Sequence, residues 1–134
     1  MERQEMQRQE IVTRTGRHYL DEDGIIRTTI LPGAEQTLED AKENIRASIV
    51  IGLGKRRPLL VDLRAIKSQT REARDCYTGP EGSRCYSAAA VLVSSPISRL
   101  IGNLSIGLSK SSSVEGRLFT SEAEALAWLK TFLA

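Results

Sequence analysis

The run Pro58-Leu59-Leu60-Val61-Asp62 constrains the fold more than any other feature of this sequence. Three consecutive aliphatic residues follow a proline and end at an aspartate, so the strand that they predict is apolar on both faces. Strands of this kind occur where helices cover both sides of a largely parallel sheet. Because ligands of such sheets gather at the carboxyl ends of the strands, we expect a functional site just beyond Asp62.

Strand and helix patterns alternate along the chain. An Asp-Gly turn between two segments rich in β-branched residues predicts a hairpin near the start. Apolar residues at three- and four-residue steps, preceded by capping residues or proline, predict the helices. Strands are expected over residues 11–20, 25–31, 59–63, 88–93 and 114–119. Helices are expected to begin at Thr37, Thr70, Pro96 and Ser121, with a loop over residues 79–82.

The resulting order is β-β-α-β-α-β-α-β-α. It predicts an α/β (α+β) fold with a mixed sheet of four to five strands, covered by helices, because right-handed crossovers make the later strands parallel. The third helix is expected to carry an apolar stripe on one side. Its members are Ile97, Leu100, Ile101, Leu104 and Leu108.

Length and composition indicate one domain. The chain has 134 residues, 40% hydrophobic and 27% charged, which suits a single globular core. Residues 1–10 consist almost wholly of Glu, Gln, Arg and Met and are expected to form a flexible polar arm before a domain spanning residues 11–134. A net charge of +2 and 4% aromatic residues argue against a nucleic-acid partner. The polar start and the lack of an apolar run of about 18 residues predict a cytoplasmic protein without an integral membrane segment.

The reactive side chains do not form a catalytic or metal-binding pattern. Cys76 and Cys85 are the two cysteines and His18 is the one histidine, too few for the roughly four ligands of a structural zinc site. In the cytosol the two thiols are expected to stay reduced and to serve as small buried residues. We therefore expect no metal, no cofactor and no enzymatic activity.

At this point the chain resembles the STAS superfamily, whose fold is that of bacterial anti-sigma-factor antagonists, and particularly the STAS/SEC14-like bacterial proteins. The resemblance spans about residues 11–134 and rests on the element order and two local patterns. The first, Val61-Asp62-Leu63-Arg64-Ala65-Ile66, is similar to the start of the loop that carries the regulatory site of the family. The second is the strand-helix joint over residues 119–129.

The resemblance implies two alternative functions. The preferred one is a non-enzymatic regulatory module that contacts a protein partner, expected to be a homodimer. The alternative is a SEC14-like carrier of a lipid or small molecule, with the helix over residues 97–108 as a movable lid. The sequence also departs from the family, because Arg71 occupies the position of its phosphorylated serine and only Ser68 and Thr70 supply hydroxyl groups nearby.

Polar residues after the two central strands form the candidate binding site for a protein partner or a small anionic ligand. Hydroxyls at a helix start, together with arginine side chains, suit a phosphate or carboxylate group. The alternative is structural: Thr70 caps its helix, and Arg71 and Arg74 are hydrated or pair with neighbouring carboxylates. The candidate residues are Asp62, Arg64, Ser68, Thr70, Arg71, Arg74, Ser94 and Ser95.

Overall fold

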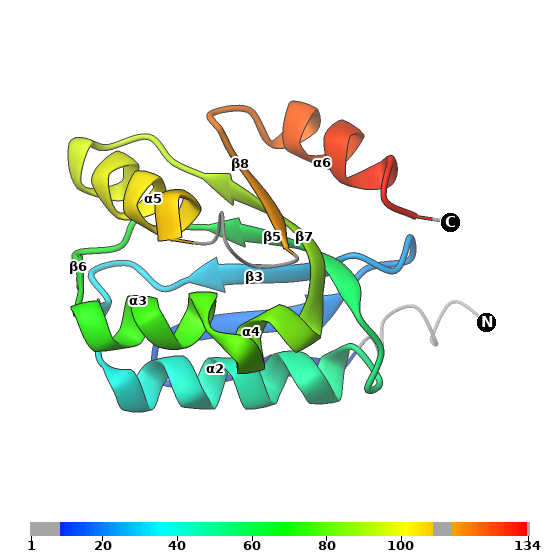
Figure 1. Ribbon diagram of the computed structural model, residues 1–134, viewed down its shortest axis with the longest axis horizontal. Coiled ribbons are helices and arrows are strands. Elements are labelled where there is room, and N and C mark those ends of the chain that lie inside the picture. The colour runs from blue at the N-terminus through cyan, green and yellow to red at the C-terminus, as the bar shows by residue number, and fades with distance from the viewer. Residues whose placement is uncertain (1–8, 109–113, 134) are drawn as a thin grey trace.

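The computed structural model describes residues 9–108 and 114–133, which form one mixed sheet between two layers of helices (Figure 1). The strand order in the sheet is β1-β2-β3-β5-β7-β8. The strands are β1 (Glu10–Val12), β2 (Gly16–Leu20), β3 (Ile26–Ile30), β5 (Arg57–Asp62), β7 (Tyr86–Leu92) and β8 (Glu115–Phe119). Two further short strands, β4 (Glu35–Gln36) and β6 (Ser68–Gln69), pair with each other in parallel.

The sheet combines an antiparallel meander with a parallel half. Strands β1, β2 and β3 pair antiparallel, whereas β3, β5, β7 and β8 run parallel. The expected mixed α/β fold is confirmed, but the expected count of four to five strands is wrong, since this sheet has six. The difference arises at residues 13–15, where a turn closed by Thr13 N–H and the Gly16 carbonyl (2.8 Å) splits one expected strand into β1 and β2.

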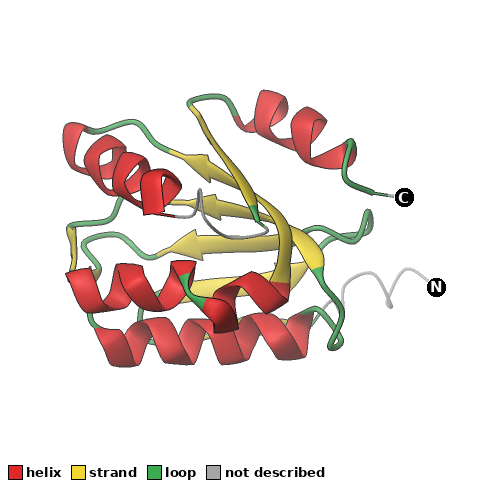
Figure 2. Cartoon of the chain, viewed as in Figure 1, coloured by secondary structure: helices red, strands yellow, loops and turns green. Residues whose placement is uncertain are grey.

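Five described helices cover the sheet (Figure 2). Four of them lie over one face, where α2 covers the meander, α3 and α4 the centre and α5 the β7–β8 end. Helix α6 alone covers the other face, against β5, β7 and β8. Their bounds are α2 (Leu38–Ile51), α3 (Arg71–Thr78), α4 (Pro80–Cys85), α5 (Pro96–Leu108) and α6 (Glu122–Lys130).

Helix α4 corrects an expectation, because the Gly-Pro segment at residues 79–82 starts a helix instead of a loop. Gly79 adopts an extended conformation as N-cap and Pro80 occupies the first turn, where a missing N–H costs nothing. Gly82 allows α4 to approach α3, since a Cβ atom there would lie 1.9 Å from the Tyr77 carbonyl oxygen. The two short helices therefore pack as one bent unit.

The expected helix starts are confirmed by their caps. Asp40 accepts hydrogen bonds from the backbone N–H and the hydroxyl of Thr37 (2.8 and 3.1 Å), completing the capping box of α2. Ser121 accepts from the N–H of Glu124 (3.2 Å) at the start of α6. Such caps satisfy backbone donors that the first helical turn leaves unpaired.

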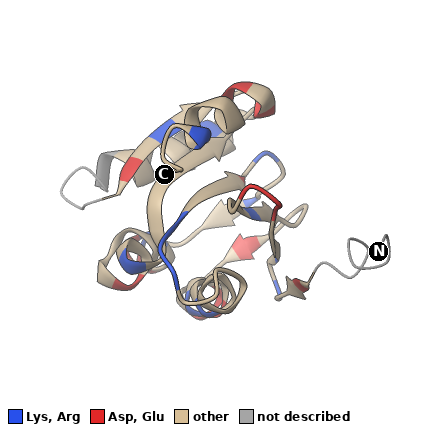
Figure 3. Ribbon diagram, turned by 90° about the vertical axis from the view of Figure 1, so that its right-hand side faces the viewer, with Lys and Arg blue, Asp and Glu red and all other residues tan. Residues whose placement is uncertain are grey.

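The apolar interior consists of three clusters. One lies under α6, a second under α2 and α4, and a third under α5. Trp128 of α6 packs on the first cluster, in tilted contact with Phe119 and edge-to-face contact with Phe132, and Arg117 lies over its ring. Trp128 is thus a packing residue of this cluster. Lysine and arginine residues are interspersed with acidic residues over the end of the molecule where the termini lie (Figure 3), in keeping with the net charge of +2.

Candidate functional site

The carboxyl ends of β5 and β7 bring the two halves of the expected site together. The strands are parallel neighbours with Asp62 opposite Leu92, and the N–H of Leu63 donates to the Leu92 carbonyl (3.0 Å). The loops after both strands, which carry the candidate residues, therefore leave the same edge of the sheet.

Asp62 forms a local ion pair with Arg64. Its carboxylate accepts from the backbone N–H, Nε and Nη2 of Arg64 at 3.0, 2.9 and 2.8 Å. Partial burial acts to raise the pKa of Asp62, but the hydrogen bonds and charge of Arg64 outweigh it, so the pKa lies below its usual value. The carboxylate stays ionised at neutral pH and holds the first turn of the loop.

The residues around the start of α3 behave as the structural alternative describes. Thr70 accepts from the N–H of Ala73 (3.1 Å) and is the N-cap of α3. Arg71 is exposed and lies 3.9 Å from Asp75, an ion pair of small energetic value. Ser68 is exposed in β6. A binding role for these residues stays a prediction.

The turn between β7 and α5 is satisfied internally. The backbone N–H groups of Ser94 and Ser95 both donate to Oγ of the buried Ser98 (2.9 Å each). Ser95 Oγ in turn accepts from the N–H of Ser98 (3.1 Å), a hydrogen bond that caps the start of α5. The backbone N–H groups of Ser94 and Ser95 are therefore already hydrogen-bonded within the turn.

Helix α5 turns most of its apolar stripe outward. Of the expected stripe, Ile101 is buried, whereas Ile97, Leu100 and Leu104 are 40%, 54% and 41% exposed. Gly102 lets the inner face of α5 approach the sheet, since a Cβ there would lie 2.8 Å from Leu118. The side chain of Leu108 lies outside the described residues. The exposed residues Ile97, Leu100 and Leu104 are called the α5 stripe below.

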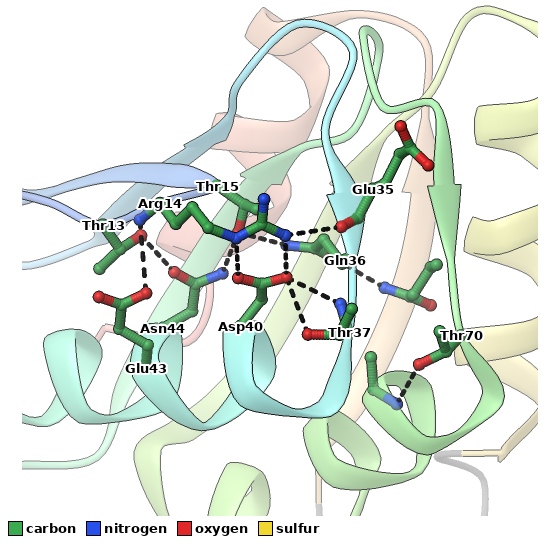
Figure 4. Close-up of polar contacts among 12 residues, drawn as sticks. Thr13, Arg14, Thr15, Glu35, Gln36, Thr37, Asp40, Glu43, Asn44 and Thr70 are labelled. Atoms are coloured by element: carbon green, nitrogen blue, oxygen red, sulfur yellow. Dashed lines mark hydrogen bonds and ion pairs between the residues drawn. The ribbon is translucent and has the colours of Figure 1, made fainter.

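A second arrangement, not foreseen from the sequence, is a buried polar cluster under α2. It consists of Thr13, Thr15, His18, Gln36, Asn44 and Tyr77. Its members come from the β1–β2 turn, β2, β4, α2 and α3. Figure 4 shows four of them, Thr13, Thr15, Gln36 and Asn44. One sequence signal marks it: Asp40, Asn44 and Ser48 recur every four residues along α2 and are all buried.

His18 is fully buried at the centre of the cluster. Its Nε2 lies 3.1 Å from Asn44 Oδ1, and its Nδ1 lies 3.0 Å from the Thr28 hydroxyl. Because an amide oxygen only accepts, Nε2 carries the proton and Nδ1 accepts from Thr28. Burial lowers the pKa of His18, although the bond to Asn44 opposes this effect. The ring is therefore neutral in the folded protein and serves as a structural group.

Asn44 connects the halves of the cluster. Its Oδ1 accepts from the Thr13 hydroxyl (2.5 Å), and its Nδ2 donates to Thr15 Oγ1 (3.1 Å) and the Tyr77 hydroxyl (2.8 Å). Gln36 also donates to Tyr77 (3.0 Å) and Thr15 (3.2 Å). Burial raises the pKa of Tyr77, so its hydroxyl keeps its proton.

An ion pair closes the cluster toward solvent (Figure 4). Arg14 Nε donates to Asp40 Oδ1 (2.7 Å) and Arg14 Nη2 to Oδ2 (2.5 Å), while Nη2 also reaches the Glu35 carbonyl (2.9 Å). Hydrogen bonding to Arg14 is the main cause that lowers the pKa of Asp40. The pair ties the β1–β2 turn to the start of α2.

Beside the polar cluster lies a cavity of about 120 Å³ between the sheet and helices α2 to α5. The cavity is only partly enclosed and is open to solvent over part of its boundary. Its described lining comprises His18, Thr28, Ile30, Gln36, Asn44, Ser48, Leu59, Val61, Leu63, Gln69, Tyr77, Thr78, Gly82, Ser83, Tyr86, Ala89, Val91, Ser105, Ile106, Val114 and Gly116.

Within the described residues, the two cysteines, the potential metal ligands and the helices indicate no further binding site and no membrane span. Cys76 is partly buried and Cys85 buried, both are free thiols, and burial raises the pKa of each. Within residues 9–108 and 114–133, no group of three or more His, Cys, Asp or Glu side chains is placed to hold a metal ion. None of the helices in those ranges is long and apolar enough to cross a membrane.

Comparisons place the chain among proteins of similar fold. A family model described as "Domain of unknown function (DUF7793)" matches residues 8–133, and no curated protein matches the sequence. An uncharacterized protein from the DUF3478 family with a SpoIIAA-like fold, from Shewanella loihica PV-4, shares 14% identity with a TM-score of 0.57 over 91% of each chain. An anti-sigma factor antagonist from Mycobacterium paratuberculosis shares 17% identity with a TM-score of 0.56, covering 91% of this chain and 93% of that one. At these identities the likeness shows the fold alone.

Proposed function

Because the chain belongs to the family described as Domain of unknown function (DUF7793) and has the fold of the STAS superfamily, we propose that it is a non-enzymatic regulatory module that binds another protein. The expected resemblance to the STAS superfamily is confirmed in the fold. One neighbour of that fold is an anti-sigma factor antagonist, and this analogy supports a regulatory role.

The α5 stripe is the observation that carries the proposal. Ile97, Leu100 and Leu104 recur at i, i+3 and i+7 and are all at least 40% exposed. Arg99 is the one charged residue in the sequence of α5, from Pro96 to Leu108. The solvent face of a surface helix is ordinarily polar, and a contiguous exposed apolar patch marks an interaction surface.

The charge beside the stripe indicates the character of the partner. Arg99 gives α5 a positive charge, whereas the neighbouring α3 carries two arginines and two acidic residues, and Arg64 is paired with Asp62. We therefore assign to this surface a partner protein that presents an apolar helix face with acidic side chains at its rim. In this proposal the candidate residues Ser68, Thr70, Ser94, Ser95 and Asp62 would contact that rim.

A second copy of this chain is the competing occupant. The three side chains of the stripe are each about half exposed, so burying them gains roughly 1 kcal/mol apiece. Two stripes together gain about 6 kcal/mol, at the low end of the 4–15 kcal/mol that association costs. The stripe by itself is therefore too small for a stable homodimer, which favours a different protein with complementary charge.

The cavity limits the alternative function of a carrier. An apolar cavity of about 150 Å³ holds one benzene molecule, and the cavity of this protein measures about 120 Å³. A lipid with acyl chains exceeds that space. The carrier alternative is therefore restricted to a compact small molecule.

The test uses site-specific photocrosslinking in the host. A benzophenone amino acid replaces Leu100, and the matched control carries it at Val50, an exposed apolar residue (52%) at the end of α2. We expect a heterologous adduct from position 100 alone. The captured protein is then purified, and its dissociation constant is measured with wild-type protein and with the Leu100→Asp, Arg99→Glu and Val50→Asp variants.

We expect Leu100→Asp and Arg99→Glu to weaken binding at least about tenfold, in line with loss of a central anchor and of a complementary charge. Val50→Asp should leave the dissociation constant unchanged. An adduct of twice the chain mass, or equal affinity of all variants, contradicts the proposed partner surface.

A further inference from the structure

The cavity beside the polar cluster has walls suited to an apolar molecule. Leu59, Val61 and Val91 line it from strands β5 and β7, and Ile106 of α5 and Val114 before β8 also line it. These residues come from four separate elements or their flanks, so the space is built by the tertiary fold. A largely apolar pocket with a few polar groups is the usual form of a small-molecule binding site.

The lining also determines the charge of a suitable ligand. The described lining residues include no Asp, Glu, Lys or Arg, and the buried His18 is neutral. An ion placed there would lose its hydration without a compensating countercharge, which is costly. The cavity therefore selects against carboxylates, phosphates and ammonium groups.

Tyr77 marks one polar end of the cavity. Its hydroxyl oxygen accepts from the amides of Asn44 (2.8 Å) and Gln36 (3.0 Å), which occupies both lone pairs. The hydroxyl proton is retained and, among the described residues, no third hydrogen-bond partner of this hydroxyl is found. A ligand acceptor would complete its bonding.

The amides next to Tyr77 allow a second arrangement. Gln69 donates to Gln36 Oε1 (3.1 Å), while the buried Gln69 Oε1 has no hydrogen-bond partner among the described residues. Turning over the amides of Gln36 and Gln69 exchanges the nitrogen and oxygen of each and leaves all other heavy atoms in place. Tyr77 can then donate to Gln36, and one lone pair of its hydroxyl oxygen is left to accept from a ligand. In the first arrangement the Tyr77 hydroxyl donates to a carbonyl or a hydroxyl of the ligand. In the second arrangement it accepts from a hydroxyl of the ligand.

We propose that this cavity binds a compact, uncharged, largely apolar molecule with a single hydroxyl or carbonyl group, and that this group bonds to Tyr77. The site is separate from the α5 stripe, since the stripe faces outward while Ser105 and Ile106 of the same helix line the cavity. Binding of the small molecule and of a protein partner therefore concerns two surfaces of the molecule.

Phenol, benzene and benzoate are the probes. Each is titrated into the full-length, isotope-labelled chain, and amide chemical shifts are followed by NMR. We expect saturable shifts at cavity residues with phenol and benzene, and phenol to bind roughly five- to tenfold more tightly, the gain of one buried hydrogen bond. Benzoate should cause no saturable shift at these residues.

Two tyrosine variants test the role of Tyr77. Tyr77→Phe should bring the affinity for phenol to within about twofold of that for benzene. Tyr86→Phe is the matched control, because Tyr86 also lines the cavity but donates to Ser48 (2.9 Å) within the protein, so the preference for phenol should persist. Circular dichroism confirms that both variants are folded.

A third variant checks the location. Ala89 faces the cavity from β7, and Ala89→Leu should fill the space and abolish binding of both neutral probes, whereas Leu100→Gln on the α5 stripe should leave it unchanged. Absence of saturable shifts at millimolar phenol, binding of benzoate as tight as that of phenol, or an undiminished preference in Tyr77→Phe overturns the proposal. The proposal is also overturned if Leu100→Gln abolishes binding of the neutral probes while Ala89→Leu retains it.

Discussion

Helices α2 and α5 cover the same face of the sheet with opposite distributions of polarity. Helix α2 turns a polar stripe inward, with Asp40, Asn44 and Ser48 each at most 3% exposed. Helix α5 turns an apolar stripe outward, with Leu100 and Leu104 among its exposed residues. Both helices depart from the ordinary amphipathic pattern, but in opposite senses.

The difference lies in the partners of each stripe. Every polar side chain of the α2 stripe has a hydrogen-bond partner from another element: Arg14 for Asp40, Thr15 and Tyr77 for Asn44, and Tyr86 for Ser48. The α5 stripe faces solvent in the described structure. A buried polar group with partners specifies one arrangement of the chain, whereas an exposed apolar group contributes little to folding and is available for binding.

The largest effect is expected from breaking the polar stripe at Asn44. Asn44→Ala removes the hydrogen bonds to four buried partners, Thr13, Thr15, His18 and Tyr77. Thr15 and Tyr77 keep their bonds to Gln36, but the buried Nε2 of His18 loses its amide acceptor, so we expect a loss of about 3 kcal/mol in the free energy of unfolding. Urea denaturation measures it. Lys42→Ala, an exposed position on the same helix, should change the value by less than about 0.5 kcal/mol. Equal effects of the two variants would contradict a structural role of the cluster.

A smaller effect is expected from protonation of His18. The folded protein holds this ring neutral with a lowered pKa, whereas in the unfolded chain it titrates near 6.5. The unfolded state therefore binds more protons below about pH 6.5, and stability should fall by at most about 1 kcal/mol as the pH falls from 6.5 to 5.5. Because His18 is the one histidine of the chain, no other histidine contributes to this slope. Thermal or urea unfolding across this pH range should show that the stability of His18→Gln depends less on pH than that of the wild type. An equally weak pH dependence of the wild-type protein would contradict a neutral, buried His18.

The smallest effect on folding is expected at the α5 stripe. Leu100→Gln should change the free energy of unfolding by less than about 0.5 kcal/mol, because the side chain is 54% exposed. The same substitution at the neighbouring Ile101, 4% exposed, should cost about 3 kcal/mol by burying an unpaired amide. Urea denaturation of both variants measures the difference in stability between the exposed and the buried face of α5. A large loss in Leu100→Gln would show that the stripe serves the fold.

Local signals were sufficient for most of the architecture. The capping box at Thr37, the caps at Thr70 and Ser121 and the order of strands and helices were predicted from neighbouring residues and are confirmed. The split of the first strand, the short strands β4 and β6, and helix α4 were not predicted. At the split and at α4 a turn residue, Gly16 or Gly79, is compatible with more than one local structure, and contacts with the rest of the chain select between them.

The sequence by itself determined the class of fold and the placement of the candidate loops, because periodicity, caps and turns depend on residues only a few positions apart. Tertiary structure decided which side of α5 faces solvent and which distant groups meet. Asn44 joins residues up to 33 positions away, from Thr15 to Tyr77, and the cavity is enclosed by segments from across the chain. Burial and hydrogen-bond partnership depend on how helices lie across the sheet, and no local pattern encodes that geometry.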